Sequence, residues 1–277
     1  MFAVRELKEY PAGKVCRLLE IPRSTFYDHI RNTRKDRTND PLSNRVGEIF
    51  LHHNGSFGTR HLKQLLQQEG IQLSRRRISR IMKQLGLRSK YGRRKAKNVY
   101  TSENTQQYIP ENLFLTLQDE DKKKEIWSMD FTEQKIRGKK VFTCGIISVN
   151  RKVVTGYLQS YSCKADLAVQ TVLEAVRDYG VPYMIHTDRG SQFTSKDFHD
   201  TMEQLGIRHS MSRPHTPADN RFIETFWKTM KVEIGKTSHL TPELYRLVVD
   251  YYIHYYNYER PHSALAFRPP LLANPVI

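Results

Sequence analysis

The chain has 277 residues, of which 38% are hydrophobic and 27% charged, enough apolar material for one core plus an accessory module. It contains no run of 18 apolar residues and no signal peptide, so we expect a cytoplasmic protein that neither spans a membrane nor is secreted. Cys16, Cys144 and Cys163 are odd in number and lack metal-site spacing, which predicts reduced thiols.

The net charge of +16 is concentrated in the N-terminal third of the chain. Residues 1–100 contain 23 Lys and Arg against 8 Asp and Glu, whereas residues 101–277 contain 22 against 21. This segregation is typical of a DNA-binding module joined to a nearly neutral domain. A basic solubility surface is the alternative, although it would rarely be so segregated.

Two stretches of the basic third predict pairs of helices. Residues 12–31 have the length and polarity pattern of a helix-turn-helix, but a helical hairpin that packs on a partner fits equally well. Residues 58–70 and 74–86 predict a second pair, in which Gly70 ends the first helix and Ser74 caps the second. The positions expected to face inward are Leu62, Leu65, Leu66, Ile78, Ile81, Met82 and Leu85.

Arginines dominate the exposed face of the last predicted helix of this pair, and a basic run follows it. We expect these side chains to contact DNA, mainly its phosphates, with a solvated face or a passive tether as the alternatives. The arginines are Arg75, Arg76, Arg77, Arg80, Arg93 and Arg94. The predicted domains are a helix-turn-helix-like module over 1–40, a second basic one over 41–97, a linker over 98–124, and a larger domain with a C-terminal helix and tail over 125–277.

Three predicted strands, over residues 125–136, 139–150 and 152–162, form an antiparallel meander. A helix is predicted from 164 to 180, and a short apolar strand over 181–188 follows it. In the first strand the polar set Ser128, Asp130 and Thr132 alternates with the apolar set Trp127, Met129 and Phe131, so the two sets should lie on opposite faces.

Asp188 closes the short apolar strand, and Glu224 lies in the next predicted helix, which runs from Asp219 or Asn220 to Gly235. Asn220, Glu224, Lys228 and Lys231 share one stripe of that helix, beside an apolar stripe of Ile223, Trp227 and Met230. An ordinary surface pair between Glu224 and Lys228 also fits this spacing, and would contribute only a few tenths of a kcal/mol.

The last predicted helix begins at Thr241 and Pro242 and extends for about 15 residues. Its apolar stripe is expected to cover the sheet or the helix of Glu224, with stacking on unpaired bases as the less common role for aromatic side chains. The stripe consists of Tyr245, Val248, Val249, Tyr252 and Tyr256.

Asp130, Asp188 and Glu224 are three carboxylates that chain folding can bring together. Carboxylate oxygens are the ligands that Mg²⁺ prefers, and two ions about 4 Å apart serve in-line phosphoryl transfer. With 29 acidic residues in the chain, accidental triples are also expected. Glu133 is left out of the set because its offset from Asp130 points it to the opposite face of a strand.

Four motifs carry a resemblance to a known family: WSMDFTE at 127–133, HTDRGSQF at 186–193, DNRFIETFWKTMKVE at 219–233 and YNYERPHSAL at 256–265. They resemble the catalytic core of bacterial insertion-sequence transposases of the second-reading-frame type, which are related to retroviral integrases. The resemblance covers about residues 45–277. It implies an α/β fold, an RNase H-like mixed sheet with flanking helices, preceded by small all-α helix-turn-helix modules.

The resemblance also implies DNA cleavage and strand transfer that depend on Mg²⁺ or Mn²⁺, with two ions expected. Asp130, Asp188 and Glu224 become the catalytic triad and the metal ligands. Ser191 and Gln192, with the DNA-contacting Lys228 and Lys231, would position the strand. The expected supporting residues are Arg189, Gln192, Asn220, Arg260 and His262, and His186 would help Arg189 to orient the acids.

Double-stranded DNA is the implied partner, as the terminal inverted repeats of the element and as the target, and holding two ends implies at least a homodimer. The zinc module of retroviral integrases is not expected, because His52 and His53 have no following cysteine pair. Two other functions stay open: a DNA-binding regulator or inactive transposase fragment, and an RNase H-like nuclease that cuts without joining. Dependence on an upstream polypeptide also stays open.

Overall fold

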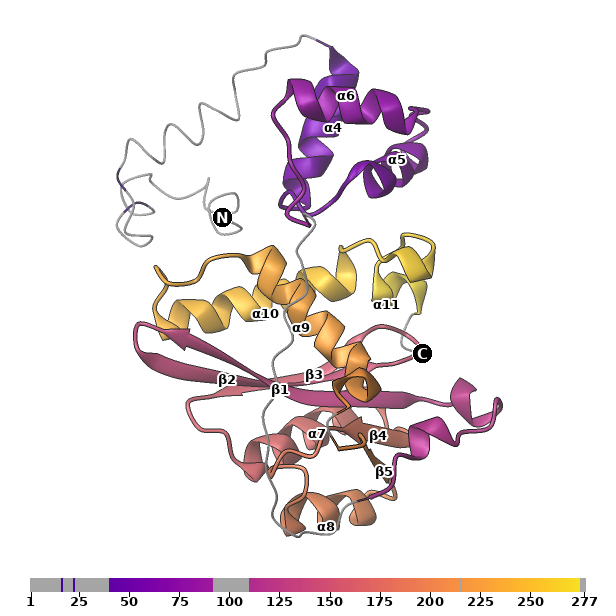
Figure 1. Cartoon of the computed structure of the whole chain (residues 1–277), viewed down its shortest axis with the longest axis vertical. Helices are drawn as coiled ribbons and strands as arrows, with labels where there is room; N and C mark the ends of the chain where they lie inside the picture. The colour runs from indigo at the N-terminus through magenta and orange to yellow at the C-terminus, as the bar shows by residue number, and fades with distance from the viewer. Residues whose placement is uncertain (1–15, 17–21, 23–39, 92–109, 215, 275–277) are drawn as a thin grey trace.

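A computed structural model describes residues 16, 22, 40–91, 110–214 and 216–274. These residues form a helical part, 40–91, and an α/β part, 110–274 (Figure 1). The helix pair expected within residues 12–31 and the predicted DNA contacts Arg93 and Arg94 lie outside the described residues.

The helical part consists of α4 (Pro41–His52), α5 (Thr59–Gln68) and α6 (Arg75–Gln84) around one apolar core. The sequence predicted α5 and α6, and Ser74 caps α6 as expected, because its side chain accepts a hydrogen bond from the Arg77 N–H. Helix α4 was not predicted. Its start is nevertheless encoded locally, since Asp40 accepts from the Leu42 N–H and Pro41 occupies the first turn.

Five strands form one mixed sheet in the order β3-β2-β1-β4-β5. The meander of β1 (Ile126–Ile136), β2 (Lys139–Ser148) and β3 (Val154–Ser160) is antiparallel, as predicted. Strand β4 (Met184–Thr187) runs parallel to β1, and β5 (Arg208–Met211) runs parallel to β4. The short β5 was not predicted. The result is an α/β fold with the expected mixed sheet.

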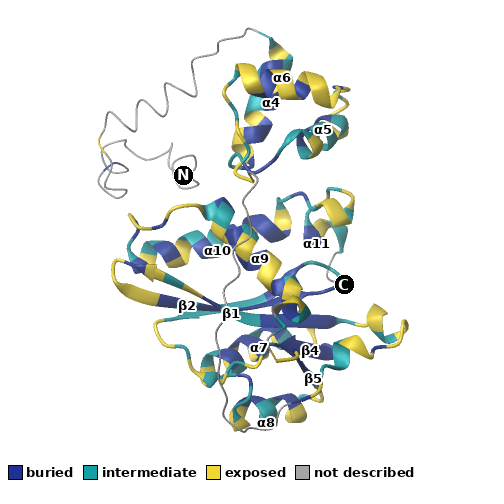
Figure 2. Cartoon of the chain, viewed as in Figure 1, coloured by how far each residue is buried: buried dark blue, intermediate teal, exposed yellow. Residues whose placement is uncertain are grey.

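Helices cover both faces of this sheet (Figure 1). One face packs against α7 (Ala165–Tyr179) and α8 (Lys196–Gln204), of which α8 was not predicted, and the other packs against α9 (Arg221–Ile234) and α10 (Pro242–Tyr258). Buried residues accordingly follow the sheet and the inward sides of these helices (Figure 2). The remaining elements are short: η2 (Leu113–Leu115), η3 (Asp121–Lys123), η4 (Pro217–Asn220), η5 (Ser263–Leu265) and α11 (Pro270–Ala273).

Strand alternation in β1 decides which side chains face which helices. Trp127 and Met129, which the sequence predicted to share one face of the strand, are fully buried in the apolar cluster with α7 and α8. The polar set that includes Asp130 therefore faces the α9 side of the sheet. The aromatic stripe of α10 is buried with the apolar side of α9, which favours core packing over base stacking for these tyrosines. Among the described residues, no helix is both long enough and apolar enough to cross a bilayer.

Candidate active site

Asp130 lies in the middle of β1, opposite Gly145 of β2. Gly145 leaves room for the Trp227 ring of α9, because a Cβ at this position would lie 2.5 Å from Trp227 Cη2. Glycine weakens a strand interior, so its presence there often marks a close approach by another group. Here the approaching group is α9, which brings its own side chains beside Asp130.

Asp188 directly follows β4, the strand that pairs in parallel with β1. Because Ser128 is in register with His186, two further residues along each chain bring Asp130 and Asp188 to the same level of the sheet. Asp188 Oδ1 accepts the Gly190 N–H at 2.9 Å, which holds the turn that the sequence predicted after this carboxylate.

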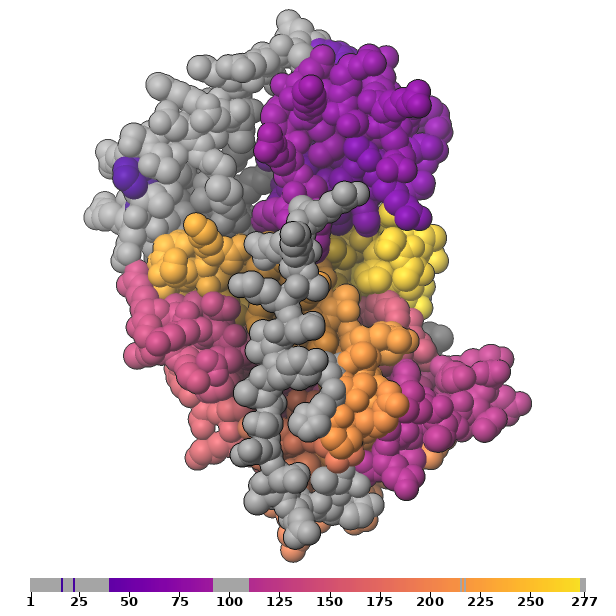
Figure 3. All heavy atoms as spheres, viewed as in Figure 1, coloured from indigo at the N-terminus to yellow at the C-terminus, as the bar shows by residue number. Residues whose placement is uncertain are grey.

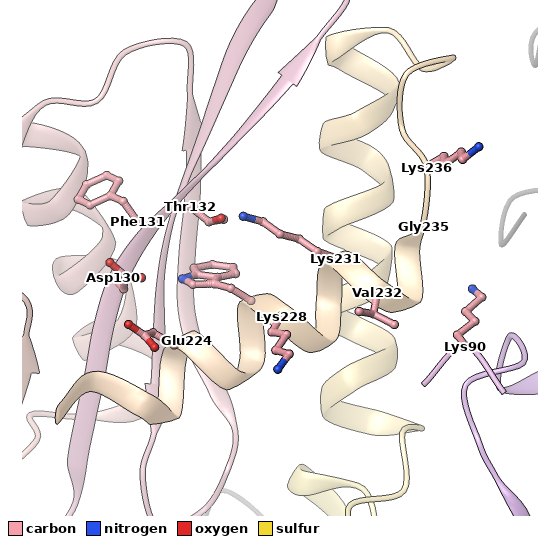
Figure 4. Close-up of a pocket in the computed structure, with 11 residues that line it drawn as sticks. Lys90, Asp130, Phe131, Thr132, Glu224, Lys228, Lys231, Val232, Gly235 and Lys236 are labelled. Atoms are coloured by element: carbon pink, nitrogen blue, oxygen red, sulfur yellow. The ribbon is translucent and has the colours of Figure 1, made fainter. Parts of the chain in front are cut away.

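Glu224 lies in the first turn of α9, and Asn220 fixes the start of that helix against β1. The buried Asn220 amide donates to the Met129 carbonyl oxygen at 3.0 Å, and its Oδ1 accepts from the Ser128 hydroxyl at 2.5 Å. Both partners belong to the strand segment that carries Asp130. The Asp130 and Glu224 carboxylates consequently face one another (Figure 4).

The three carboxylates act on one another electrostatically. Burial, followed by the charges of Asp188 and Glu224, raises the pKa of Asp130 to about 8, while a backbone hydrogen bond from Phe131 and the charge of Lys231 oppose the rise. The pKa of Asp188 is raised by burial, and that of Glu224 is raised by burial and by Asp188. The charge of Lys231 lowers the pKa of Asp130, but it does not offset the increase caused by burial and by the neighbouring carboxylates.

Among the described residues, no three Asp, Glu, His or Cys side chains are gathered as tightly as the ligands of a bound metal. Like charges that share a site repel one another, so these carboxylates are not expected to close up until a cation neutralises them. The arrangement is therefore that of neighbouring, mutually destabilised carboxylates rather than of a preformed cage.

A groove of about 830 Å³ runs from Asp130 and Glu224 along α9 to the helical part. Lys231 extends toward Thr132 on β1, whereas Lys228 points away from the sheet (Figure 4). Partial desolvation lowers the pKa of Lys231, and the nearby Asp130 and Glu133 oppose that shift. The groove is basic along its length, since its lysines are Lys90, Lys228, Lys231 and Lys236.

The sequence around this site matches known protein families. Two descriptions of the integrase core domain match residues 120–217 and 205–270, together more than half of the chain, and an HTH-like domain matches residues 37–95. The transposase for insertion sequence element IS904 of Lactococcus lactis is 28% identical over 246 residues, which cover 87% of this chain and 96% of that protein.

Transposase InsF for insertion sequence IS3A of Escherichia coli is 24% identical over 271 residues, covering 95% of this chain and 93% of that protein. Among solved structures, the HTLV-2 integrase catalytic core domain in complex with magnesium is 16% identical with a TM-score of 0.44, covering 54% of this chain and 95% of that chain. The chain belongs to the insertion-sequence transposase family. Its family assigns this transposase to DNA transposition and integration, which is a polynucleotidyl transfer.

The predicted supporting residues of the transposase lie in different places. The Gln192 side chain donates a hydrogen bond to Cys163 Sγ at 3.2 Å. Burial raises the pKa of the Cys163 thiol, and the charges of Asp130 and Asp188 add to the rise, so this pair lies near the carboxylates. Arg189 donates to the Ser212 carbonyl oxygen at 2.8 Å, and His186 is hydrogen-bonded to the Ser210 and Ser212 hydroxyls. Neither contact reaches a carboxylate. These bonds hold the β4 and β5 ends that shape the site.

Arg260 and His262 lie behind α9, away from the carboxylates. Arg260 pairs with Glu233, and His262 packs edge-on against Tyr256. On the helical part, Arg75, Arg76, Arg77 and Arg80 are exposed along α6, where DNA can reach them. Cys16 and Cys144 are buried and Cys163 is half-buried, and all three are free thiols as predicted.

Sequence reasoning missed two contributions to this site. Gly145 was treated only as part of a strand, although a glycine inside a strand pattern is a signal of close approach. Lys90 and Lys236 line the groove, but they come from the end of the helical part and from the residues after α9, and no sequence pattern links them to Asp130.

Proposed function

We propose that this chain is a DDE-type transposase that cuts and joins DNA at the ends of its element with Asp130, Asp188 and Glu224. The observation that carries the proposal is the position of Asp130 and Glu224 at the head of a basic groove, together with the charge of Asp188, which raises the pKa of both. Carboxylates that raise one another's pKa favour a cation between them, and a lysine-lined groove favours a phosphate chain beside them.

The donor set fits Mg²⁺ or Mn²⁺. All three groups offer oxygen atoms, which hard divalent cations prefer, and the charge of Lys231 lowers the pKa of Asp130 less than burial and Asp188 raise it. Two ions bound there would neutralise charge on the attacking and leaving oxygens of an in-line displacement. Asp130, Asp188 and Glu224 would hold the metal.

The remaining roles belong to side chains that position DNA. Asn220 holds the start of α9 on β1 and so fixes the separation of Glu224 from Asp130. Lys228 and Lys231 are suited to bind phosphates on either side of the scissile bond, because both line the groove beside Glu224. In the first reaction, water attacks a phosphodiester and leaves a 3′-hydroxyl and a 5′-phosphate. In the second, that 3′-hydroxyl attacks a target phosphodiester, forms a new phosphodiester and releases a 3′-hydroxyl of the target strand.

The helical part would bind the element ends. Its exposed arginines on α6 are suited to phosphate contacts that set position, with sequence read by a minority of side chains. Joining two ends to one target requires at least two catalytic sites, so a homodimer or a higher oligomer is part of the proposal.

The test uses the purified chain, Mn²⁺ and a 5′-end-labelled duplex that carries the terminal repeat flanking its coding sequence. Joined products support a transposase. Cut products alone indicate a nuclease, and a shifted but uncut band indicates a DNA-binding protein. Addition of EDTA should abolish both cutting and joining.

Residue assignments are tested by Asp130→Asn, Asp188→Asn and Glu224→Gln, each of which should abolish cutting and joining while the band shift persists. Glu133→Gln is the matched control, because Glu133 is exposed and bonded to Lys140 at 3.0 Å. Full joining activity in any triad variant refutes the assignment of that residue.

A further inference from the structure

Glu233, near the end of α9, is a buried carboxylate with no part in the proposed chemistry. Its side chain is completely inaccessible to solvent, and it forms an ion pair with Arg260, whose side chain is only 11% exposed. The guanidinium donates to Glu233 Oε1 at 2.8 Å through Nη2 and also donates through Nε. A buried charge of this kind is tolerated only when its partners are in place.

The partners of Glu233 come from three other segments. The Tyr252 hydroxyl of α10 donates to Oε2 at 3.1 Å, and Arg260 belongs to the tail after α10. Tyr91, at the end of the helical part, donates its hydroxyl to Oε1 at 2.7 Å. Its neighbour Lys90 donates to the Glu233 carbonyl oxygen at 2.7 Å. We call this cluster of Lys90, Tyr91, Glu233, Tyr252 and Arg260 the joint.

At the joint, the helical part is hydrogen-bonded directly to α9, the helix that carries Glu224. Other contacts between the two parts involve α10 and the tail: His53 is hydrogen-bonded to the Tyr255 hydroxyl, the His61 ring meets Phe267, and Arg260 lies over the Phe57 ring. In the space-filling view the helical part rests directly on the C-terminal elements (Figure 3).

Helix α9 is consequently held at both ends. Asn220 ties its start to β1, and Glu233 ties its last turn to the joint. Glu224 lies between these two anchors, nine residues before Glu233, or about 14 Å along a rigid helix. A small displacement of the helical part, applied through Tyr91, would therefore move or tilt the helix that carries Glu224.

We propose that Glu233 and Tyr91 are positioning residues, through which DNA bound by the helical part sets the place of Glu224 relative to Asp130. This inference rests on the proposed function. Binding of an element end is then coupled, through the joint, to the competence of the active site.

The experiment compares two duplexes at saturating concentration with full-length protein and Mn²⁺. The long duplex carries the cleavage site and the adjoining DNA that the helical part can hold, and the short duplex carries the cleavage site alone. We expect the wild type to have a higher kcat on the long duplex. In Tyr91→Phe, the ratio of long to short kcat should fall by roughly tenfold, a typical coupling between two sites, while kcat on the short duplex is unchanged.

Tyr161→Phe is the matched control, because it removes a tyrosine hydroxyl that donates to a glutamate, Glu243, at an exposed position away from the joint. Its ratio should equal that of the wild type. Thermal unfolding of both variants, and their affinity for the long duplex, separate loss of coupling from loss of stability or of DNA binding.

The outcomes are distinct. A fall in the ratio with unchanged affinity for the long duplex supports the proposal. An unchanged ratio in Tyr91→Phe, an equal loss on both duplexes, or a wild type that does not distinguish the duplexes overturns it. If the wild type cuts neither duplex although it binds both, the proposed function itself fails.

Discussion

Two glutamates of α9, Glu224 and Glu233, are in opposite electrostatic environments. Glu224 is exposed to solvent on one side, and partial desolvation and the charge of Asp188 raise its pKa. It forms no hydrogen bond or ion pair within the described part of the chain. Glu233 is fully buried and is bonded to Arg260, Tyr91 and Tyr252.

The environment of Glu224 is suited to bind a cation, whereas the carboxylate of Glu233 already has its hydrogen-bond and ion-pair partners. Around Glu224 the fold collects negative charge and leaves it uncompensated, at a cost to stability that a bound cation would relieve. Around Glu233 the fold supplies donors to the carboxylate from three segments and gains a fixed geometry. Substitutions in these two environments should therefore change stability in opposite directions.

The largest effect on stability is expected from Glu233→Ala. This change leaves the Arg260 guanidinium buried without its carboxylate and should cost about 3–5 kcal/mol in the free energy of unfolding, measured by urea denaturation. Glu259→Ala is the control, because the Glu259 and His52 side chains are 39% and 57% exposed and such pairs contribute at most about 1 kcal/mol. Equal losses in the two variants would contradict the contrast.

Gly145→Ala should come next. The new methyl group would lie 2.5 Å from Trp227 Cη2, so the ring and α9 must shift, at about 1–3 kcal/mol for overpacking. Because Glu224 moves with α9, cutting activity should fall more than the folded fraction does. Gly58→Ala is the matched control, since nothing lies within 4 Å of a Cβ there. Wild-type activity in Gly145→Ala would mean that Trp227 does not set the position of α9.

Acid should loosen the contact between the two parts. Burial lowers the pKa of His53 from 6.5 to about 3, so the folded state disfavours protonation. The stability from neutral His53 is present above pH 6.5 and is lost as pH falls toward 3, by about 2 kcal/mol between pH 6.5 and 5. In His53→Gln the fall in unfolding free energy over this range should be shallower, whereas exposed His52→Gln should follow the wild type. Equal slopes in all three would exclude His53 as a contributor.

The smallest effect has the opposite sign. Asp130→Asn removes a charge from the crowded carboxylates and should raise the metal-free stability by about 1 kcal/mol. The pKa of Asp130 is raised from 3.8 to about 8, so wild-type stability falls as pH rises from about 4 to about 8, and the gain should be largest above pH 8. Thermal unfolding with EDTA measures it. A destabilised Asp130→Asn would show that the repulsion is not significant.

Addition of Mg²⁺ or Mn²⁺ sharpens this last comparison. A cation that binds only the folded state raises its stability according to its concentration relative to Kd. The wild type should therefore gain thermal stability with increasing metal, and Asp130→Asn should not. Glu259→Ala changes an exposed glutamate that is part of neither the carboxylate site nor the joint, so it should keep the metal response.

Periodicity predicted the elements that carry the carboxylates because each has a strong local signal. Strand β1 alternates clearly, and α9 is bracketed by prolines before it and Gly235 after it. The elements that were missed have weaker signals: α8 buries only two of its residues, Phe198 and Met202, and the four-residue β5 contains one apolar side chain, Met211. Their place depends on the tertiary core rather than on local pattern.

The joint could not have been predicted in the same way. Glu233 and Tyr91 are 142 positions apart in the chain, and their bond depends on how one part docks on the other. In the sequence Lys90 and Tyr91 read as the start of a basic run, and Glu233 was visible only as one position of a motif. Arg260 was expected to support the site, and the structure shows that it binds Glu233 on the far side of α9.

Tyr91 has a practical consequence for exchanging the recognition module between related enzymes. Helix α6 ends at Gln84, and a hybrid spliced directly after it keeps the recipient's own Tyr91 against Glu233. A splice placed beyond position 91 would instead import the donor's own side chain against a native carboxylate. A change of DNA specificity therefore calls for a crossover before Leu87 that retains Lys90 and Tyr91 of the recipient. Only the DNA-binding surface is then replaced, and the contact between the helical part and α9 is kept.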